Sequence, residues 1–190
     1  FYGIVPDTVG NVADFIVIDN VNHFTVSSLH VLLTRHGFEE IEIDTSVHRG
    51  ALVFTARKKG QVSEKVTIEP AISQSLALAN YWTEIGNQIK ASELGNELGA
   101  SAIYGSGFYG AYIFSTLKHS ERVQCFLDKS PYQQGKALFG KAILAPENLP
   151  ARTKALFVGL NPAIARNVMA SLSWPDSPDL KLIFLDGASQ

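Results

Sequence analysis

The sequence predicts an α/β protein whose second half is a parallel-sheet domain. Two observations lead to this prediction. From about residue 100 onward, short apolar runs alternate with helical patterns, which is typical of βαβ units with right-handed crossovers. The first sixty residues instead end with two strands joined by a short turn, which favours a partial α/β segment that ends in an antiparallel hairpin. We therefore expect a closing segment (1–60), a connecting helical segment (61–98) and a sheet domain (99–190).

The composition excludes several classes of partner. The chain has 190 residues, of which 46% are hydrophobic and 18% charged, as in ordinary soluble domains. A net charge of -2 with scattered basic residues argues against a nucleic-acid partner. The single cysteine and the lack of a cysteine/histidine cluster with zinc-site spacing favour a reducing compartment and no metal. No apolar run approaches the roughly 20 residues that cross a bilayer. We expect a cytoplasmic protein.

The closing segment has a clear helix and hairpin. Thr25 is a suitable N-cap for the apolar stripe that follows it, and Gly37 is a suitable residue to end that helix. Strands are predicted at 39–47 and 51–57. Because the chain begins at Phe1 inside a predicted strand, we expect a fragment of a longer chain; a complete small protein is the alternative.

A long helix is predicted after Pro70, where apolar residues recur every three or four positions. We interpret it as a connecting helix packed between two modules rather than as part of a binding site. The residues of its apolar face are Ile72, Leu76, Ala79, Trp82, Ile85 and Ile89.

The sheet domain is predicted to alternate strands and helices. Asn161-Pro162 marks a helix start, and Cys125 is expected to be buried in the middle of the second strand. Residues 129–150 are predicted to be rich in loops. The predicted strands are 100–104, 122–127, 155–158 and 181–185, and the first helix is 108–117.

A glycine motif follows the first of these strands and opens its helix. The segment Gly105-Ser106-Gly107-Phe108-Tyr109-Gly110 fits G-x-G-x-x-G in the context where that pattern has meaning. Gly105 would allow a tight turn, Gly107 would let a phosphate approach the backbone, and Gly110 would let the helix pack close to the strand. The motif predicts a Rossmann-like nucleotide-binding domain; a purely architectural turn is the alternative.

An acidic and a basic group complete the predicted substrate site. Asp128 ends the second strand about twenty residues after the glycines, where a carboxylate can bind ribose hydroxyls; the alternative is that it only caps its own turn. Lys136, like Lys129, Lys141 and Arg166, can neutralise a diphosphate. The predicted substrate-binding residues are Gly105, Ser106, Gly107, Phe108, Gly110, Asp128 and Lys136.

Candidate catalytic residues lie just before the helix predicted after Thr25, where Asp19, Asn22 and His23 cluster in the sequence. The imidazole of His23 can transfer protons near neutral pH. No partner for it is fixed by spacing, and a loop histidine that bonds to backbone is the alternative. Asp19 and His23 are the predicted catalytic residues.

These motifs resemble a known enzyme group. The first segment resembles the end of the catalytic domain of class I S-adenosylmethionine-dependent methyltransferases, through Val5-Pro6-Asp7, His23-Phe24-Thr25, Gly37-Phe38 and Ala56-Arg57-Lys58. The whole chain resembles the sugar C-methyltransferase group, in which a smaller Rossmann-like domain follows. The second-domain matches are Tyr104-Gly105, Asp128-Lys129-Ser130-Pro131 and Gly135-Lys136.

The resemblance implies a nucleotide-linked sugar as substrate and S-adenosylmethionine as cofactor of the parent protein. The cofactor's glycine loop belongs to the amino-terminal half of such a domain, so this chain alone should bind no cofactor and should not methylate; that missing half is an expected partner. The group's Glu-His pair is replaced here by Asp19-Asn20. If the histidine of that pair is the base, His23 is the candidate substitute for deprotonating a sugar carbon; O- or N-methylation, or a different substrate, are the alternatives. An NAD-dependent oxidoreductase fragment and a non-catalytic interaction module are the alternatives.

Overall fold

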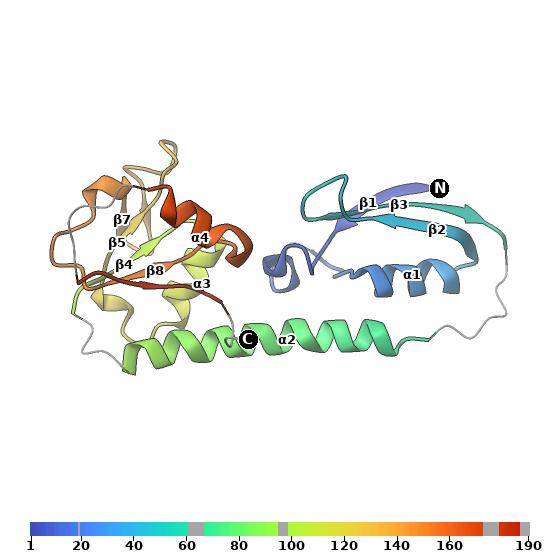
Figure 1. Ribbon diagram of the computed structural model, residues 1–190, viewed down its shortest axis with the longest axis horizontal. Helices are drawn as coiled ribbons and strands as arrows, with labels where there is room; N and C mark the ends of the chain where they lie inside the picture. Colours follow the sequence, from blue (N-terminus) through green and yellow to red (C-terminus); the bar gives the residue numbers. More distant parts are fainter. Residues whose placement is uncertain (19, 61–66, 95–98, 173–178, 187–190) are drawn as a thin grey trace. The chain divides into compact units, whose positions relative to one another are not determined.

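The computed structural model describes residues 1–18, 20–60, 67–94, 99–172 and 179–186. The chain divides into two compact units, Phe1–Tyr81 and Trp82–Gln190, each with its own sheet (Figure 1).

Unit 1 is built on a three-stranded sheet in which the last strand lies in the middle. Its order is β1-β3-β2, and β3 pairs antiparallel with both neighbours, so β1 and β2 run parallel to each other. The strands are β1 (Tyr2–Pro6), β2 (Phe38–Asp44) and β3 (Ala51–Lys58), and β1 is followed by the short 3-10 helix η1 (Val12–Phe15). β2 and β3 follow one another in the chain and pair antiparallel.

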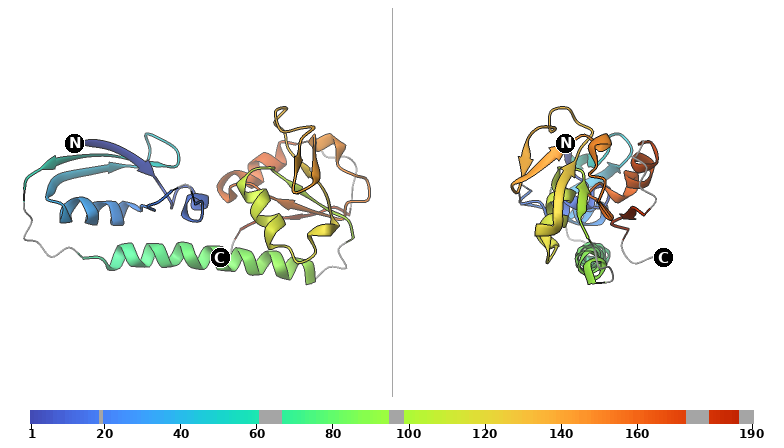
Figure 2. Two further views of the ribbon diagram at one scale, coloured as in Figure 1. Left: turned by 180° about the vertical axis from the view of Figure 1, so that it is seen from behind. Right: turned by 90° about the vertical axis from the view of Figure 1, so that its left-hand side faces the viewer.

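One face of this sheet is covered by α1 (Val26–Arg35), as the left view of Figure 2 shows from behind. Leu29 and Leu33 of the helix form a core with Leu52 and Phe54 of β3. The predicted N-cap is confirmed: the Thr25 hydroxyl accepts from the Ser28 amide (3.1 Å), and the Ser28 hydroxyl accepts from the Thr25 amide (2.8 Å). Gly37 ends the helix with a φ of +75°, as predicted.

The predicted long helix is α2 (Glu69–Leu94). From Trp82 onward it belongs to unit 2, where Trp82, Ile85 and Ile89 are buried. Polar contacts hold this part in place. The Tyr112 hydroxyl donates to the carbonyl of Trp82 (3.2 Å), and the Glu93 carboxylate accepts from two backbone amides, those of Lys118 and His119.

Unit 2 is a six-stranded sheet of order β6-β7-β5-β4-β8-β9, in which every pair is parallel except β6 with β7. The predicted α/β class with a parallel sheet is confirmed at this level. The strands are β4 (Ser101–Tyr104), β5 (Val123–Leu127), β6 (Ala137–Leu138), β7 (Lys141–Leu144), β8 (Ala155–Val158) and β9 (Lys181–Ile183).

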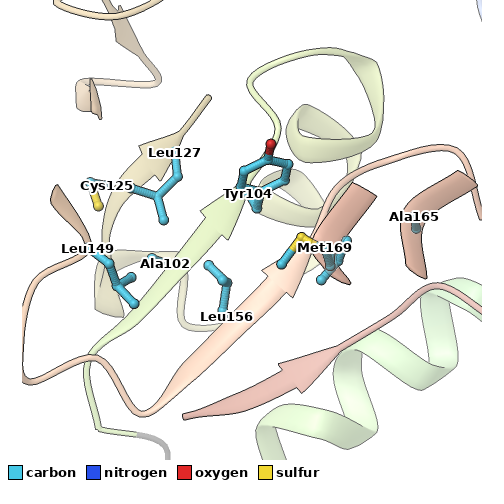
Figure 3. Packing of buried hydrophobic residues seen from close by; sticks show 9 residues of the cluster. Ala102, Tyr104, Cys125, Leu127, Leu149, Leu156, Ala165 and Met169 are labelled. Atoms are coloured by element: carbon cyan, nitrogen blue, oxygen red, sulfur yellow. The ribbon is translucent and has the colours of Figure 1, made fainter. Parts of the chain in front are cut away.

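Helices pack on both faces of this sheet. On one face, Phe114 of α3 (Phe108–Thr116) contacts Phe126 of β5, with ring centroids 5.7 Å apart. On the other, Ala165 and Met169 of α4 (Pro162–Ala170) pack against side chains of β4, β5 and β8 (Figure 3). Cys125 lies in this second core, as predicted, and burial raises the pKa of its thiol to about 11.

The segment 129–150 consists mostly of turns and loops, as predicted, but it also contains strands that were not predicted. It holds the hairpin β6–β7 and the short 3-10 helix η3 (Pro146–Asn148), and β7 is the third parallel strand of the sheet. The strand escaped prediction because it has only four residues, between Gly140 and Pro146, and only Ile143 within it is fully buried. So short a run shows no periodicity.

Candidate functional site

The strand order of unit 2 places a reversal point beside β4. The chain passes from β4 outward through β5 and β7, then returns to the other side of β4 to form β8 and β9. In open α/β sheets, ligands bind outside the carboxyl ends of the strands at such a point. Here the two strands are β4 and β8, and the turns that follow them carry Gly105 and Gly159.

Three glycines let the backbones at this point approach each other closely. Gly105 has a φ of +94°, and a Cβ there would collide with the carbonyl of Gly159. A Cβ on Gly110 would collide with the carbonyl oxygen of Gly105, and a Cβ on Gly159 would lie 2.7 Å from the Cα of Gly110. The roles predicted for Gly105 and Gly110 follow from this packing.

Gly107 differs from the other two glycines of the motif. It is exposed, and a Cβ built on it meets nothing within 4 Å. It is the N-cap of α3, and no side chain caps that helix end. The start of a helix carries a partial positive charge, and its first amides have no hydrogen-bond acceptor within the helix. A phosphate could therefore approach the backbone here without displacing protein atoms.

Asp128 points toward the glycine turn and is bonded to it. Its Oδ2 accepts from the amide (2.9 Å) and the hydroxyl (2.5 Å) of Ser106, and its Oδ1 accepts from the amide of Ser130 (2.9 Å). Oδ2 thus uses both of its lone pairs, and Oδ1 has one lone pair left. The carboxylate thus ties β5 to the turn after β4, and a ribose hydroxyl would have to share it.

Burial raises the pKa of Asp128, but the hydrogen bonds from Ser106 and Ser130 outweigh it and hold the pKa below its ordinary value. A carboxyl with a depressed folded-state pKa stabilises the fold above its unfolded value, about 3.9, and loses that contribution as the pH falls through the folded pKa. We expect the free energy of unfolding to fall in this acid range, and the fall to be shallower in Asp128→Asn. Urea unfolding at a series of pH values measures both slopes; equal slopes would contradict the assignment.

The remaining predicted substrate-binding residues are Phe108, the first residue of α3, and Lys136, which lies beside β7. The Phe108 ring is 36% exposed and meets the Trp82 ring edge-on at 6.0 Å. Lys136 has an exposed side chain, and its carbonyl accepts from the amide of Ile143, so it lies level with the carboxyl end of β7. Its role toward a diphosphate stays a prediction.

Gly159 was not predicted at this site, and Asn161 was predicted as a helix start but not as part of the site. The Gly159 amide donates to the carbonyl of Tyr104 (2.7 Å), and the Asn161 side chain caps α4 by accepting from the amide of Ala163 (3.0 Å). A glycine directly after an apolar strand and before a helix-starting Asn-Pro was the available signal. The second helix, α4, therefore starts beside the glycine motif.

The predicted catalytic residues belong to unit 1. His23 is exposed, and its ring meets Phe15 edge-on at 5.7 Å. Within the described part of unit 1, no hydrogen bond fixes its imidazole. Asp19 lies outside the described residues. Over the ranges that the structure describes, no group of His, Cys, Asp and Glu is arranged to hold a metal ion, and no helix is long and apolar enough to cross a membrane.

Comparisons with protein-family models and with curated proteins found no match to this chain.

Proposed function

We propose that unit 2 binds the nucleotide of a nucleotide-linked sugar or a similar small molecule at the carboxyl ends of β4, β5 and β8. One observation carries this proposal: the space beside Gly107, at the start of α3, is empty, whereas the neighbouring glycines are packed against protein. A diphosphate would lie against the start of α3, and the attached ribose would reach Asp128.

We further propose that the chain is the carboxyl-terminal part of a cytoplasmic S-adenosylmethionine-dependent methyltransferase. The motifs of unit 1 and the arrangement of a closing α/β segment before a Rossmann-like domain support this reading. In this proposal the cofactor is bound by another part of the parent protein, and unit 2 contributes to holding the substrate. His23 is the candidate base, and the atom that accepts the methyl group stays open.

Ligand-induced stabilisation tests the nucleotide assignment. A ligand at one hundred times its dissociation constant stabilises the folded state by roughly 2.7 kcal/mol. We expect UDP-glucose to raise the melting temperature of the chain, and S-adenosylmethionine to leave it unchanged, because this chain lacks the cofactor's glycine loop.

The same experiment separates the alternatives. A rise with NAD and none with UDP-glucose would replace the proposal with a nicotinamide-binding domain. No rise with either nucleotide, over a range of concentrations, would favour an interaction module whose glycine turn is architectural.

A further inference from the structure

The turn that follows β5 is held in place by hydrogen bonds at both of its ends. It covers residues 128–136. The side-chain amide of Gln134 donates to the carbonyl of Asp128 (2.9 Å), and the backbone amide of Gly135 donates to the carbonyl of Ile143 in β7 (3.0 Å). Gly135 has a φ of +80°, which lets the chain reverse there. The turn is therefore attached to the end of β5 and to β7.

The middle of this turn carries an aromatic ring without a partner in the described parts of the chain. Tyr132 is 85% exposed. Among the described residues, its ring contacts no other aromatic ring and its hydroxyl makes no hydrogen bond. An aromatic side chain stabilises a fold through the surface that it buries, so this ring contributes little to the stability of unit 2. Its apolar faces are available to a ligand.

The charges of the turn suit an anionic ligand. Residues 129–136 include Lys129 and Lys136 and no acidic side chain. Both lysines are exposed, and neither forms an ion pair with any residue that the structure describes. Aromatic rings next to basic side chains are the combination with which proteins bind the bases and phosphates of nucleotides. The turn is thus complementary to a nucleotide in both its ring and its charge.

The strand order places this turn next to the site proposed for the phosphates and the ribose. Strands β4, β5 and β7 are consecutive neighbours in the sheet (Figure 1). The phosphates are assigned to the turn after β4 and the ribose to Asp128 after β5. Neighbouring strands lie about 4.8 Å apart, so a ligand that continues in the same direction next meets the segment attached to β7. Tyr132 belongs to that segment.

We propose that the ring of Tyr132 is the stacking surface for the base of the nucleotide. This inference rests on the nucleotide site proposed above and names the residue that holds the base. Every base has a π-face, so stacking of this kind accepts different bases alike. The contact therefore selects nucleotides over ligands without a base, and it does not select one base over another.

Calorimetric titration with UDP tests the proposal. Tyr132→Ala should weaken the affinity by about tenfold, because it removes one stacked ring. Tyr132→Phe keeps the ring and should bind like the wild type. The matched control is Tyr2→Ala, which removes an exposed tyrosine of unit 1 and should leave the affinity unchanged. Thermal unfolding without ligand should give the same melting temperature for Tyr132→Ala and the wild type.

Fluorescence of the variant Tyr132→Trp tests the stacking itself. UDP should quench the emission of this variant in a saturable manner and by more than it changes the emission of the wild type. Ribose 5-phosphate, which has no base, should not produce this extra quenching. Absence of the extra quenching by UDP would contradict the stacking.

The outcomes separate this inference from the proposed function. If Gly107→Val weakens UDP binding and Tyr132→Ala does not, the phosphate site stands and the base site is overturned. An equal loss of affinity in Tyr132→Phe and Tyr132→Ala would assign the contact to the hydroxyl and would also overturn the stacking. If the wild-type chain binds no UDP at any concentration, the proposed function fails together with this inference.

Discussion

Gly110→Ala is expected to destabilise unit 2 by about 3 kcal/mol or more, because the new methyl group would collide with backbone. The Cβ would fall on the carbonyl oxygen of Gly105 and would also lie 3.4 Å from Cγ2 of Ile103. A carbonyl in a tight turn cannot rotate away as a side chain can, and Gly105 is itself held by its amide, which donates to the carbonyl of Leu127 (2.7 Å). Urea unfolding followed by circular dichroism measures the loss.

The control for this variant is Gly107→Ala, three residues away in the same motif. The space around Gly107 is empty, and its φ of -88° suits any residue, so its cost should stay below about 1 kcal/mol, the difference between glycine and alanine as N-caps. An equal loss of stability in both variants would contradict the conclusion that the close approach of Gly105, Gly110 and Gly159 stabilises this part of the fold.

The second large effect is expected on binding rather than on stability. Gly107→Val should weaken binding of UDP-glucose by at least about tenfold, because its side chain would occupy the space that the proposal gives to a phosphate. Calorimetric titration measures the affinity. Ser115→Val is the matched control, since Ser115 is exposed on α3 away from the helix start. Unchanged affinity in Gly107→Val would place the ligand elsewhere.

The sequence predicted those parts of the fold where a local signal and the tertiary structure agree. The capping residue Thr25, the second half of the apolar stripe of α2 and the glycine motif each have a pattern that depends on near neighbours. In the first half of that stripe the structure differs from the prediction, because Ile72 and Leu76 are exposed. Strand β7 and the position of β3 between β1 and β2 have no such local sequence pattern. Strand order depends on pairings between distant segments, which leave no trace in the local periodicity.

The candidate site was predicted to a similar extent. The motif predicted the tight turn at Gly105 and the close packing at Gly110, and Asp128 lies near the glycine turn, as its spacing in the sequence predicted. The spacing could not show that Ser106 already donates two hydrogen bonds to this carboxylate. Nor could it show that Gly159, more than forty residues later, closes against Gly110, because that contact exists only when β8 pairs with β4.

The most direct test of the account is to map UDP binding by the amide resonances of the isotopically labelled chain. If a phosphate binds at the start of α3, the Gly107 and Phe108 amides should shift with UDP concentration, together with Ser106 and Asp128, and β3 of unit 1 should show no shifts. Shifts that left the glycine turn unaffected, with saturable changes elsewhere, would contradict the placement of a phosphate at this helix start.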